Sequence, residues 1–274
     1  MGELLRDAQK KRYGIGYFNT VNLEMVRACI RAAEACRAPI IIGTAEALLP
    51  YAELEWIAPV LLEQARRAKV PVAVHLDHAY HFDVLMRALR CGFGSVMYDG
   101  SREASHADNV ARSAQLVRIA HAMGAGVECE LGSVGGLSDE NGRADAVVYT
   151  EPDDARTFLE ETGADFLAVS IGTAHGIYTA PPRLDLPRLH QIRAAVSAPL
   201  VLHGGSGLSD ADFQATVAGG ICKINVFTDV ILAAKQALCA APENTYLDAV
   251  KAAEAAMAKA VEDKLCLFGS AGRA

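Results

Sequence analysis

The 274-residue chain has no apolar run long enough to cross a membrane, which takes roughly 18 or more consecutive apolar residues. Its opening residues, MGELLRDAQKKRYG, lack the apolar core of a secretory signal peptide. An excess of basic charge is also missing, because 26 Lys and Arg face 33 Asp and Glu and give a net charge of −7. Nucleic-acid-binding proteins normally carry a basic patch. We therefore expect a cytoplasmic protein with neither a membrane nor a nucleic-acid partner.

Cysteine motifs are missing as well. The chain has seven cysteines, an odd number, and no two of them form a CxxC pair. They are Cys29, Cys36, Cys91, Cys129, Cys222, Cys239 and Cys266. This scatter indicates neither a disulfide framework nor a thiolate zinc site. We interpret most of these cysteines as small core residues.

Linkers and low-complexity segments are absent too. No Ser/Gly-rich stretch or charge block divides the chain. Its 51% hydrophobic and 22% charged residues are close to the globular averages of about 45–50% and about 25%, which excludes extended disorder. Length alone permits one or two domains, since barrels of alternating strands and helices commonly reach about 250 residues as one domain.

Short β-rich runs alternate with longer Ala-, Leu- and Arg-rich stretches that have helical periodicity. The predicted strands are Tyr13–Asn19, Pro39–Gly43, Pro71–Asp77, Gly94–Asp99, Ala125–Glu130, Asp165–Ser170, Pro199–His203 and Ile221–Asn225. These runs are almost continuously apolar, which is typical of parallel strands buried on both faces. The strand–helix units predict a single α/β domain, a (β/α)8 TIM barrel over residues 1–274. A doubly wound sheet is the alternative, because alternation alone does not reveal closure.

Two irregular segments stand out. Gly132–Val148 is the longest irregular stretch and follows the fifth predicted strand. Long loops in compact domains are usually functional or mobile, so residues 132–148 are predicted to form a mobile active-site loop. The tail Phe268–Ala274 has little to bury and is predicted to be flexible.

Polar residues collect at the carboxyl ends of the predicted strands. At or just past these ends stand Asn19, Asp77, His78, Asp99, Glu130, His203 and Asn225, and His175 lies in the loop after the sixth strand. In a barrel these ends face one mouth, where the active sites of this fold lie. The pattern therefore predicts one site assembled from many separate segments.

Three histidines, His78, His175 and His203, come from three different strand ends. Three neutral imidazoles with a fourth position open form a common catalytic zinc site, which polarises a substrate oxygen. A single histidine is more often a hydrogen-bonded structural residue, so the zinc prediction rests on the three together. The remaining histidines are His75, His81, His106, His121 and His190. We expect His75 beside the ligands and the other four on the surface.

Asp77 directly precedes one of these histidines at a strand end. A carboxylate there can be a metal ligand, an orienter of a neighbouring histidine, or the general acid/base that exchanges a proton with the substrate. The residue types alone do not choose among the three roles.

Glycine-rich turns follow two predicted strands, in IGTAHG (171–176) and HGGSG (203–207). Glycine lets backbone N–H groups approach an anion, and loops late in such barrels often hold phosphate at a helix N-terminus. Each turn by itself is equally consistent with a tight turn and nothing more. Both are interleaved with the histidines, which favours a phosphate site. Asn225 and Thr228, in KINVFTD, would extend the same wall with uncharged hydrogen-bonding groups.

The motifs around these residues resemble the class II, zinc-dependent ketose-bisphosphate aldolases, the family of fructose- and tagatose-bisphosphate aldolases. The resembling segments are GYFNTVNLEMVRA, VAVHLDHAYHFD, GFGSVMYDGS, VECELGSVGG, DFLAVSIGTAHGIY, PLVLHGGSGL, GICKINVFTD and FGSAGRA. They run over almost the whole chain. The resemblance implies a (β/α)8 barrel that forms a homodimer or homotetramer. It also implies a lyase of carbohydrate metabolism that reversibly cleaves a ketose phosphate to dihydroxyacetone phosphate and an aldehyde.

The resemblance also implies roles for the matching residues. The implied zinc ligands are His78, His175 and His203, with Asp77 as the acid/base at the aldehyde-derived hydroxyl and with Asp99 and Glu130 near an alternative metal position. The implied contacts of dihydroxyacetone phosphate are Gly176, Gly204, Ser206, Asn225 and Thr228, to which we add Asn19. The glycine turns also match a site for a monovalent cation, Na⁺ or K⁺.

The chain departs from the family pattern at several places. Thr179 stands where relatives have a lysine. The segment Thr44–Pro50 (TAEALLP) stands where relatives often have a Ser- and Gly-containing phosphate contact followed by a lysine. Residues 241–247 (APENTYL) lack the arginine that many relatives carry in an Asp-Pro-Arg motif. Ser138 stands at or near the position where many relatives carry an acidic residue used for proton transfer. Asp139 or Glu140 could take over this role, or the proton could travel through water.

These departures remove cations that would bind a second phosphate, whose charge-assisted contacts are strong. They predict a ketose 1-phosphate substrate with a non-phosphorylated or unusual distal end. The first alternative is an ordinary fructose- or tagatose-1,6-bisphosphate aldolase in which Arg102 and Arg183 supply the charge. The second is a non-catalytic aldolase-like subunit, which retention of the three histidines and Asp77 disfavours.

Overall fold

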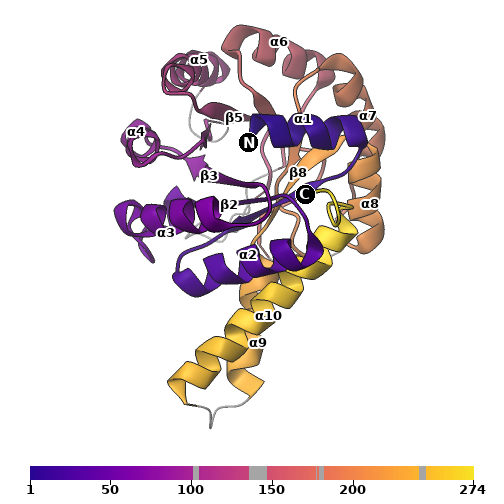
Figure 1. Ribbon diagram of the computed structural model, residues 1–274. Helices are drawn as coiled ribbons and strands as arrows, with labels where there is room; N and C mark the ends of the chain where they lie inside the picture. Colours follow the sequence, from indigo (N-terminus) through magenta and orange to yellow (C-terminus); the bar gives the residue numbers. More distant parts are fainter. Residues whose placement is uncertain (101–104, 136–146, 177, 179–181, 241–244) are drawn as a thin grey trace, which may run out of the picture.

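Eight parallel strands close into a barrel in chain order, with the helices outside it (Figure 1). This computed structural model describes residues 1–274 except 101–104, 136–146, 177, 179–181 and 241–244. The strands are β1 Ile15–Asn19, β2 Ile40–Ala45, β3 Val72–Ala79, β4 Ser95–Tyr98, β5 Gly126–Leu131, β6 Phe166–Val169, β7 Leu200–Leu202 and β8 Ile221–Val226. Pairing of β8 with β1 closes the barrel. The (β/α)8 barrel is confirmed, and the doubly wound alternative is wrong.

Helices connect successive strands and cover the outside of the barrel (Figure 1). They are α1 Gly2–Lys11, α2 Leu23–Cys36, α3 Leu54–Arg67, α4 Phe82–Cys91, α5 His106–Ala122, α6 Pro152–Thr162, α7 Leu186–Ala195, α8 Asp210–Ala218, α9 Thr228–Ala240 and α10 Tyr246–Leu267, with a 3₁₀ turn η1 at Glu46–Leu48. The helix α1 precedes the first strand. Its buried Leu5 and Ala8 pack on Ile15 and Phe166, which begin β1 and β6, so α1 covers the amino-terminal end of the barrel.

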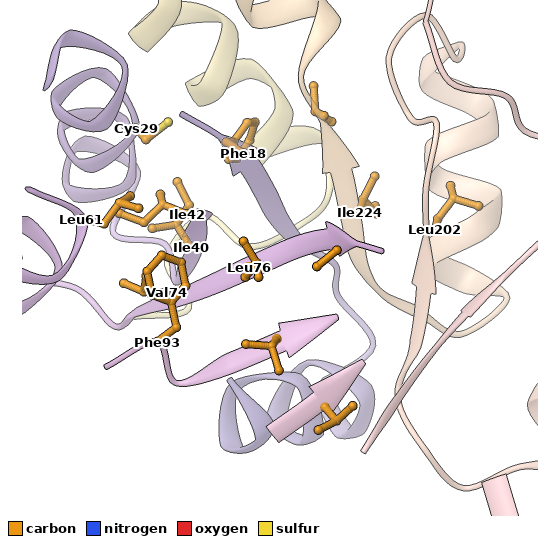
Figure 2. Close-up of a cluster of buried hydrophobic side chains, with 14 of the residues drawn as sticks. Phe18, Cys29, Ile40, Ile42, Leu61, Val74, Leu76, Phe93, Leu202 and Ile224 are labelled. Atoms are coloured by element: carbon orange, nitrogen blue, oxygen red, sulfur yellow. The ribbon is translucent and has the colours of Figure 1, made fainter. Parts of the chain in front are cut away.

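The core has two layers because side chains alternate between the two faces of each strand. In β2, Ile40 and Ile42 point outward to the helices, where they join Phe18, Leu61 and other side chains (Figure 2). Ile41, between them, belongs to the separate cluster inside the barrel. All six residues of β2 are buried, which is why its sequence is apolar without alternation.

Capping residues fix where the helices after the strands begin. Asn22 accepts a hydrogen bond from the Met25 backbone N–H at the start of α2. Ser209 and Asp212 form a reciprocal capping box at the start of α8. Each such cap stabilises its helix by ~1 kcal/mol. These caps hold the loops that follow β1 and β7, both of which lead to the mouth of the barrel.

The last two helices form a hairpin that projects away from the barrel (Figure 1). The base of α10 packs on α2, where the buried Glu254 carboxylate accepts from the Arg31 guanidinium at 2.9 Å and Arg27 lies 3.4 Å away. Toward the tip, Tyr246 and Leu247 are 80% and 75% exposed. The hairpin therefore presents apolar side chains that this chain does not cover by itself.

The carboxyl-terminal tail corrects one expectation. Phe268 is buried against Phe213, with ring centroids 5.1 Å apart, and its carbonyl accepts from Gly14 N–H at 2.8 Å. Beyond it, the Gly272 and Ala274 amides donate to backbone carbonyls at the end of α2. Phe268 is thus buried, contrary to the expectation that the tail has little to bury, because its partners are far away in the sequence. The flexibility of residues 268–274 stays a prediction.

The cysteines are free, as their spacing indicates. Cys29, Cys129 and Cys222 are buried in the core, whereas Cys239 and Cys266 are exposed. Among the described residues, no helix combines the length and apolar composition that spanning a membrane requires.

Candidate active site

The carboxyl ends of the strands surround a cavity of about 480 Å³. It is lined by Asn19, Ala47, Asp77, His78, His175, Gly176, Gly204, Gly205, Ser206, Asn225, Val226, Phe227, Thr228 and Ile231. A larger hollow of about 790 Å³ lies under α1 at the opposite end, but neither Asp77 nor any of the predicted histidine ligands lines it. We therefore take the cavity at the carboxyl ends as the candidate active site because of the residues that line it, although it is the smaller of the two. Active sites of this fold lie at the same end of the barrel.

Strand β3 brings Asp77 and His78 to this mouth together, although neighbouring residues of a strand normally face opposite sides. The pairing register with β4 shifts between Leu76 and Ala79, which marks a β-bulge. His78 has φ of 32°, in the left-handed region that a non-glycine residue rarely adopts. Bulges and strained backbone of this kind are concentrated at functional sites, where they redirect side chains.

The three histidines predicted as ligands converge. His78 comes from β3, His175 from the loop after β6, and His203 directly follows β7. One ring nitrogen from each lies within 4.8 Å of the others. The His78 ring centroid is 4.9 Å from that of His175 and 4.4 Å from that of His203. The structure thus brings these three side chains into one donor set.

Carboxylates behind two of the rings determine which nitrogen faces the cavity. The Nδ1 of His78 lies 2.8 Å from Asp99 Oδ2, and the Nε2 of His203 lies 2.9 Å from Glu128 Oε1. A carboxylate only accepts hydrogen bonds, so these two nitrogens carry the protons. The other nitrogens, His78 Nε2 and His203 Nδ1, lie 2.6 Å apart with their lone pairs directed at one another. Such an arrangement requires a cation or a proton between them.

The negative charge of the buried carboxylates around the three histidines also favours a bound cation. Four buried carboxylates, those of Asp77, Asp99, Glu128 and Glu130, lie at this end of the barrel. Among the described residues, Lys223 is the one buried lysine or arginine. A buried charge without compensation is strongly unfavourable. Three histidine nitrogens beside these buried carboxylates fit a divalent metal ion that favours imidazole, such as zinc.

In the metal-free protein, protonation of His78 places a positive charge beside these carboxylates. Burial lowers the pKa of His78, but the carboxylates of Asp77 and Asp99 outweigh it and raise the pKa to about 9. Burial and the neighbouring His78 lower the pKa of His203, so its ring stays neutral. The His78 proton therefore occupies the place between the two rings that a metal ion would otherwise take.

Asp77 lies at the cavity wall with its carboxylate held from several sides. The amide nitrogen of Asn225 lies 3.0 Å from both Asp77 oxygens, and that of Asn19 donates to Oδ2 at 3.4 Å. Burial raises the pKa of Asp77, but His78 and Lys223 outweigh it and hold the pKa well below its usual range. Asp77 is therefore ionised and oriented, as a proton acceptor requires.

The alternative metal position predicted at Asp99 and Glu130 also exists as a geometric cluster. His78, Asp99 and Glu130 each place a ligand atom within 4.8 Å of the others. Glu130 Oε2 also lies 3.6 Å from His203 Nδ1. His78 belongs to both clusters, so the two candidate metal positions share one ligand.

The glycine turns lie where the sequence places them, in the loops that follow β6 and β7. Gly204 has φ of 67°, and a Cβ there would meet the Ala174 carbonyl oxygen at 2.4 Å. The two turns are tied together by Tyr178, whose hydroxyl accepts from Ala174 N–H and donates to the Gly204 carbonyl. Ser206 Oγ accepts from the Phe227 N–H at 3.2 Å, next to Thr228 at the start of α9. Backbone donors and a helix N-terminus at one wall suit an anionic group.

Sequence reasoning missed two residues beneath the histidines, Glu128 and Lys223. Their side chains point into the barrel, with Lys223 Nζ 2.9 Å from Glu128 Oε1. His75, expected beside the ligands, lies with them and bonds Ser95 Oγ through Nδ1 at 2.8 Å. Burial and Lys223 lower the pKa of His75 to about 3, so it is neutral. Polar residues at every second position of VECEL and ICKINV were the available signal, since alternate residues face the interior.

Several residues named from the sequence lie outside the described part of the structure. These are Arg102, Ser138, Asp139, Glu140, Thr179, residues 241–244 and residues 136–146 of the predicted loop 132–148. At the ends of that loop, Ser133 pairs with Val148, and His175 N–H donates to Gly135 O at 2.6 Å. The loop therefore starts beside one of the three histidines.

Comparison with known proteins agrees with this geometry. The family model of class-II fructose-bisphosphate aldolase matches residues 1–273. The YdjI aldolase from Escherichia coli K12 has 34% sequence identity and a TM-score of 0.91, with 100% of this chain and 98% of that chain covered. A Coccidioides immitis protein provisionally assigned as a fructose-1,6-bisphosphate aldolase has 30% identity and a TM-score of 0.91 over 99% of this chain and 96% of that chain. The chain belongs to the class II fructose-bisphosphate aldolase family.

Proposed function

We propose that this protein is a zinc-dependent aldolase that reversibly cleaves a ketose phosphate to dihydroxyacetone phosphate and an aldehyde. The observation that carries the proposal is the convergence of three histidine nitrogens beside the ionised, oriented carboxylate of Asp77. His78, His175 and His203 would hold the metal ion. When bound, zinc supplies a Lewis acid for the ketone end of the substrate.

Asp77 moves the proton in the proposed reaction. Its carboxylate accepts the proton of the C4 hydroxyl as the C3–C4 bond breaks, and returns it in the condensation direction. Asn225 and Asn19 hold the carboxylate by their amide N–H groups, which keeps both oxygens in position without neutralising them. A positioned acid/base of this kind typically contributes about 10²–10⁴-fold to the rate.

The phosphate of dihydroxyacetone phosphate would bind at the wall formed by the glycine turns. Gly176, Gly204, Ser206 and Thr228 line the cavity beside the start of α9. This wall offers backbone N–H groups, hydroxyls and a helix N-terminus in place of a cationic side chain. A monovalent cation, Na⁺ or K⁺, bound at the same turns would add positive charge there.

The composition of the cavity lining supports a substrate without a second phosphate. Among the described residues that line the cavity, none is lysine or arginine, and Ala47 and Ile231 present apolar side chains. The loop after β2 instead carries Glu46, whose carboxylate accepts from the backbone of Tyr80 and His81. Arg183, considered as a substitute cation, is exposed and is not among the lining residues. We therefore assign a ketose 1-phosphate as the preferred substrate.

Incubation of zinc-loaded protein with dihydroxyacetone phosphate and a panel of aldehydes tests this function. The panel pairs phosphorylated with unphosphorylated aldehydes, and a parallel sample contains a chelator. We expect chelator-sensitive carbon–carbon bond formation, fastest with unphosphorylated aldehydes. Absence of chelator-sensitive product from every aldehyde would contradict an aldolase function, and a preference for phosphorylated aldehydes would support the bisphosphate alternative.

We further propose that the protein acts in the cytoplasm as a homodimer or homotetramer. The exposed apolar side chains of Tyr246 and Leu247 on the α9–α10 hairpin support an assembly. Light scattering coupled to size-exclusion chromatography tests the oligomeric state, and a monomeric mass at micromolar concentration would contradict it.

A further inference from the structure

A buried ion pair lies directly beneath the three histidines. Lys223 of β8 and Glu128 of β5 are both 0% exposed. Lys223 Nζ lies 2.9 Å from each of the two Glu128 oxygens and 4.6 Å from the centre of the Tyr17 ring. Replacing such a pair by apolar residues of similar volume is often neutral or stabilising. Stability by itself therefore does not explain a lysine and a glutamate in the centre of the barrel.

The ion pair is connected to one of the proposed metal ligands through a single oxygen. Glu128 Oε1 accepts from Lys223 Nζ and also lies 2.9 Å from His203 Nε2. Because an ionised carboxylate has no proton to donate, His203 must carry its proton on Nε2. Its other nitrogen, Nδ1, is then bare and faces His78 Nε2. The orientation of Glu128 thus selects the tautomer of His203 that can bind a metal ion.

Lys223 is what holds the Glu128 carboxylate in that orientation. The Glu128 side chain otherwise lies among buried carboxylates, and Asp77 Oδ1 is 3.7 Å from the same ammonium group. The neutral His75 ring lies 3.6 Å from Glu128 Oε2 and is not within hydrogen-bonding distance. His75, Asp77 and Glu128 by themselves have the spacing of a metal cluster. The ammonium group lies against two of these three residues and supplies a positive charge beside them.

We propose that Lys223 is a positioning residue for the metal site, which acts through Glu128 to fix the proton of His203 on Nε2 and leave Nδ1 as the metal ligand. This inference rests on the proposed metal-binding role of His203. It gives Lys223 no contact with the substrate. Contacts that orient a metal ligand from behind typically change metal affinity by about 10–100-fold when they are removed.

The test compares Lys223→Met, which keeps most of the volume and removes the charge, with Met97→Leu as a control. Met97 is buried inside the barrel and is the β4 partner of Glu128 in the strand register, so Met97→Leu alters the packing beside Glu128 without removing a charge. Two measurements are made: Co²⁺ affinity with its visible absorption spectrum, and the ¹⁵N chemical shifts of His203 in metal-free protein. The wild type and Met97→Leu should show the Nε2–H tautomer and equal Co²⁺ affinity.

For Lys223→Met we expect a mixture of His203 tautomers and a Co²⁺ affinity lowered by about 10–100-fold, with the far-ultraviolet circular dichroism of the wild type. Wild-type affinity together with an unchanged tautomer would overturn the proposal. If Lys223→Met does not fold, Glu128→Gln provides the second variant, since its amide group can donate to Nε2 and stabilise the opposite tautomer. Glu128→Gln with wild-type affinity and tautomer would equally overturn it. Wild-type protein that binds no Co²⁺ would contradict the proposed function instead, and the ¹⁵N shifts would still decide whether Lys223 sets the tautomer.

Discussion

The Nε2 of His78 and the Nδ1 of His203 lie 2.6 Å apart, each opposite a ring nitrogen that bonds a carboxylate. Asp99 and Glu128 therefore turn two lone pairs toward the same point. A proton on His78 can join them, and so can a metal ion. The consequence is a direct competition between proton and metal.

This competition predicts that metal affinity depends on pH. The carboxylates raise the pKa of His78 to about 9 in the metal-free protein, so below that pH the ring is protonated and a metal ion must displace the proton. Apparent Zn²⁺ affinity should therefore rise about tenfold per pH unit between pH 6.5 and pH 8.5. Competition with a chromophoric chelator measures the apparent Zn²⁺ affinity at each pH. A Zn²⁺ affinity that does not change over this range would contradict competition of the proton and the metal ion for the position between His78 and His203.

Replacement of His203 by alanine should abolish stoichiometric zinc binding, because it removes one of the three proposed nitrogen ligands. Metal content after dialysis, measured by mass spectrometry, checks this result. His190→Ala is the matched control, since His190 is exposed on α7, and it should retain one zinc per chain. Equal zinc content in both variants would exclude His203 as a ligand.

Asp77→Asn should leave metal content unchanged while kcat falls by about 10²–10⁴-fold. Asparagine preserves the shape of the side chain but cannot accept a proton at neutral pH. Asp210→Asn, at an exposed position of α8, removes a carboxylate elsewhere and should keep wild-type kcat. Steady-state cleavage rates at saturating substrate distinguish the two. Wild-type turnover by Asp77→Asn would assign proton transfer to another group.

Phe268→Ala should lower the free energy of unfolding by about 3–5 kcal/mol, the usual effect of deleting a buried aromatic side chain. Phe268 is 1% exposed and packs on Phe213. Tyr51→Ala, at a side chain that is 76% exposed and lies outside the α9–α10 hairpin, should change this free energy by less than about 0.5 kcal/mol. Urea unfolding curves compare the two variants. A loss below about 1 kcal/mol for Phe268→Ala would restore the expectation of a tail that contributes little.

The sequence predicted the barrel, and it predicted that His78, His175 and His203 lie together at one mouth, because parallel strands bury both faces and end at the same side. Their roles stay predictions. The strand predicted at Pro39–Gly43 is observed at Ile40–Ala45, a shift of one or two residues. The bulge at His78 was not predictable, because backbone strain leaves no mark on residue composition. Lys223 and Glu128 were overlooked inside apolar runs, and the contacts of Phe268 depend on α8, which is remote in the sequence.

The most direct test of the account compares cleavage of fructose 1-phosphate with cleavage of fructose 1,6-bisphosphate by zinc-loaded protein, with and without chelator. The cavity has no described lysine or arginine in its lining to bind a second phosphate. We predict chelator-sensitive cleavage with a higher kcat/KM for the 1-phosphate, by at least about tenfold, since a lost charge-assisted contact is worth about 1.5–3 kcal/mol. An equal or higher kcat/KM for the bisphosphate would contradict the assignment of the substrate.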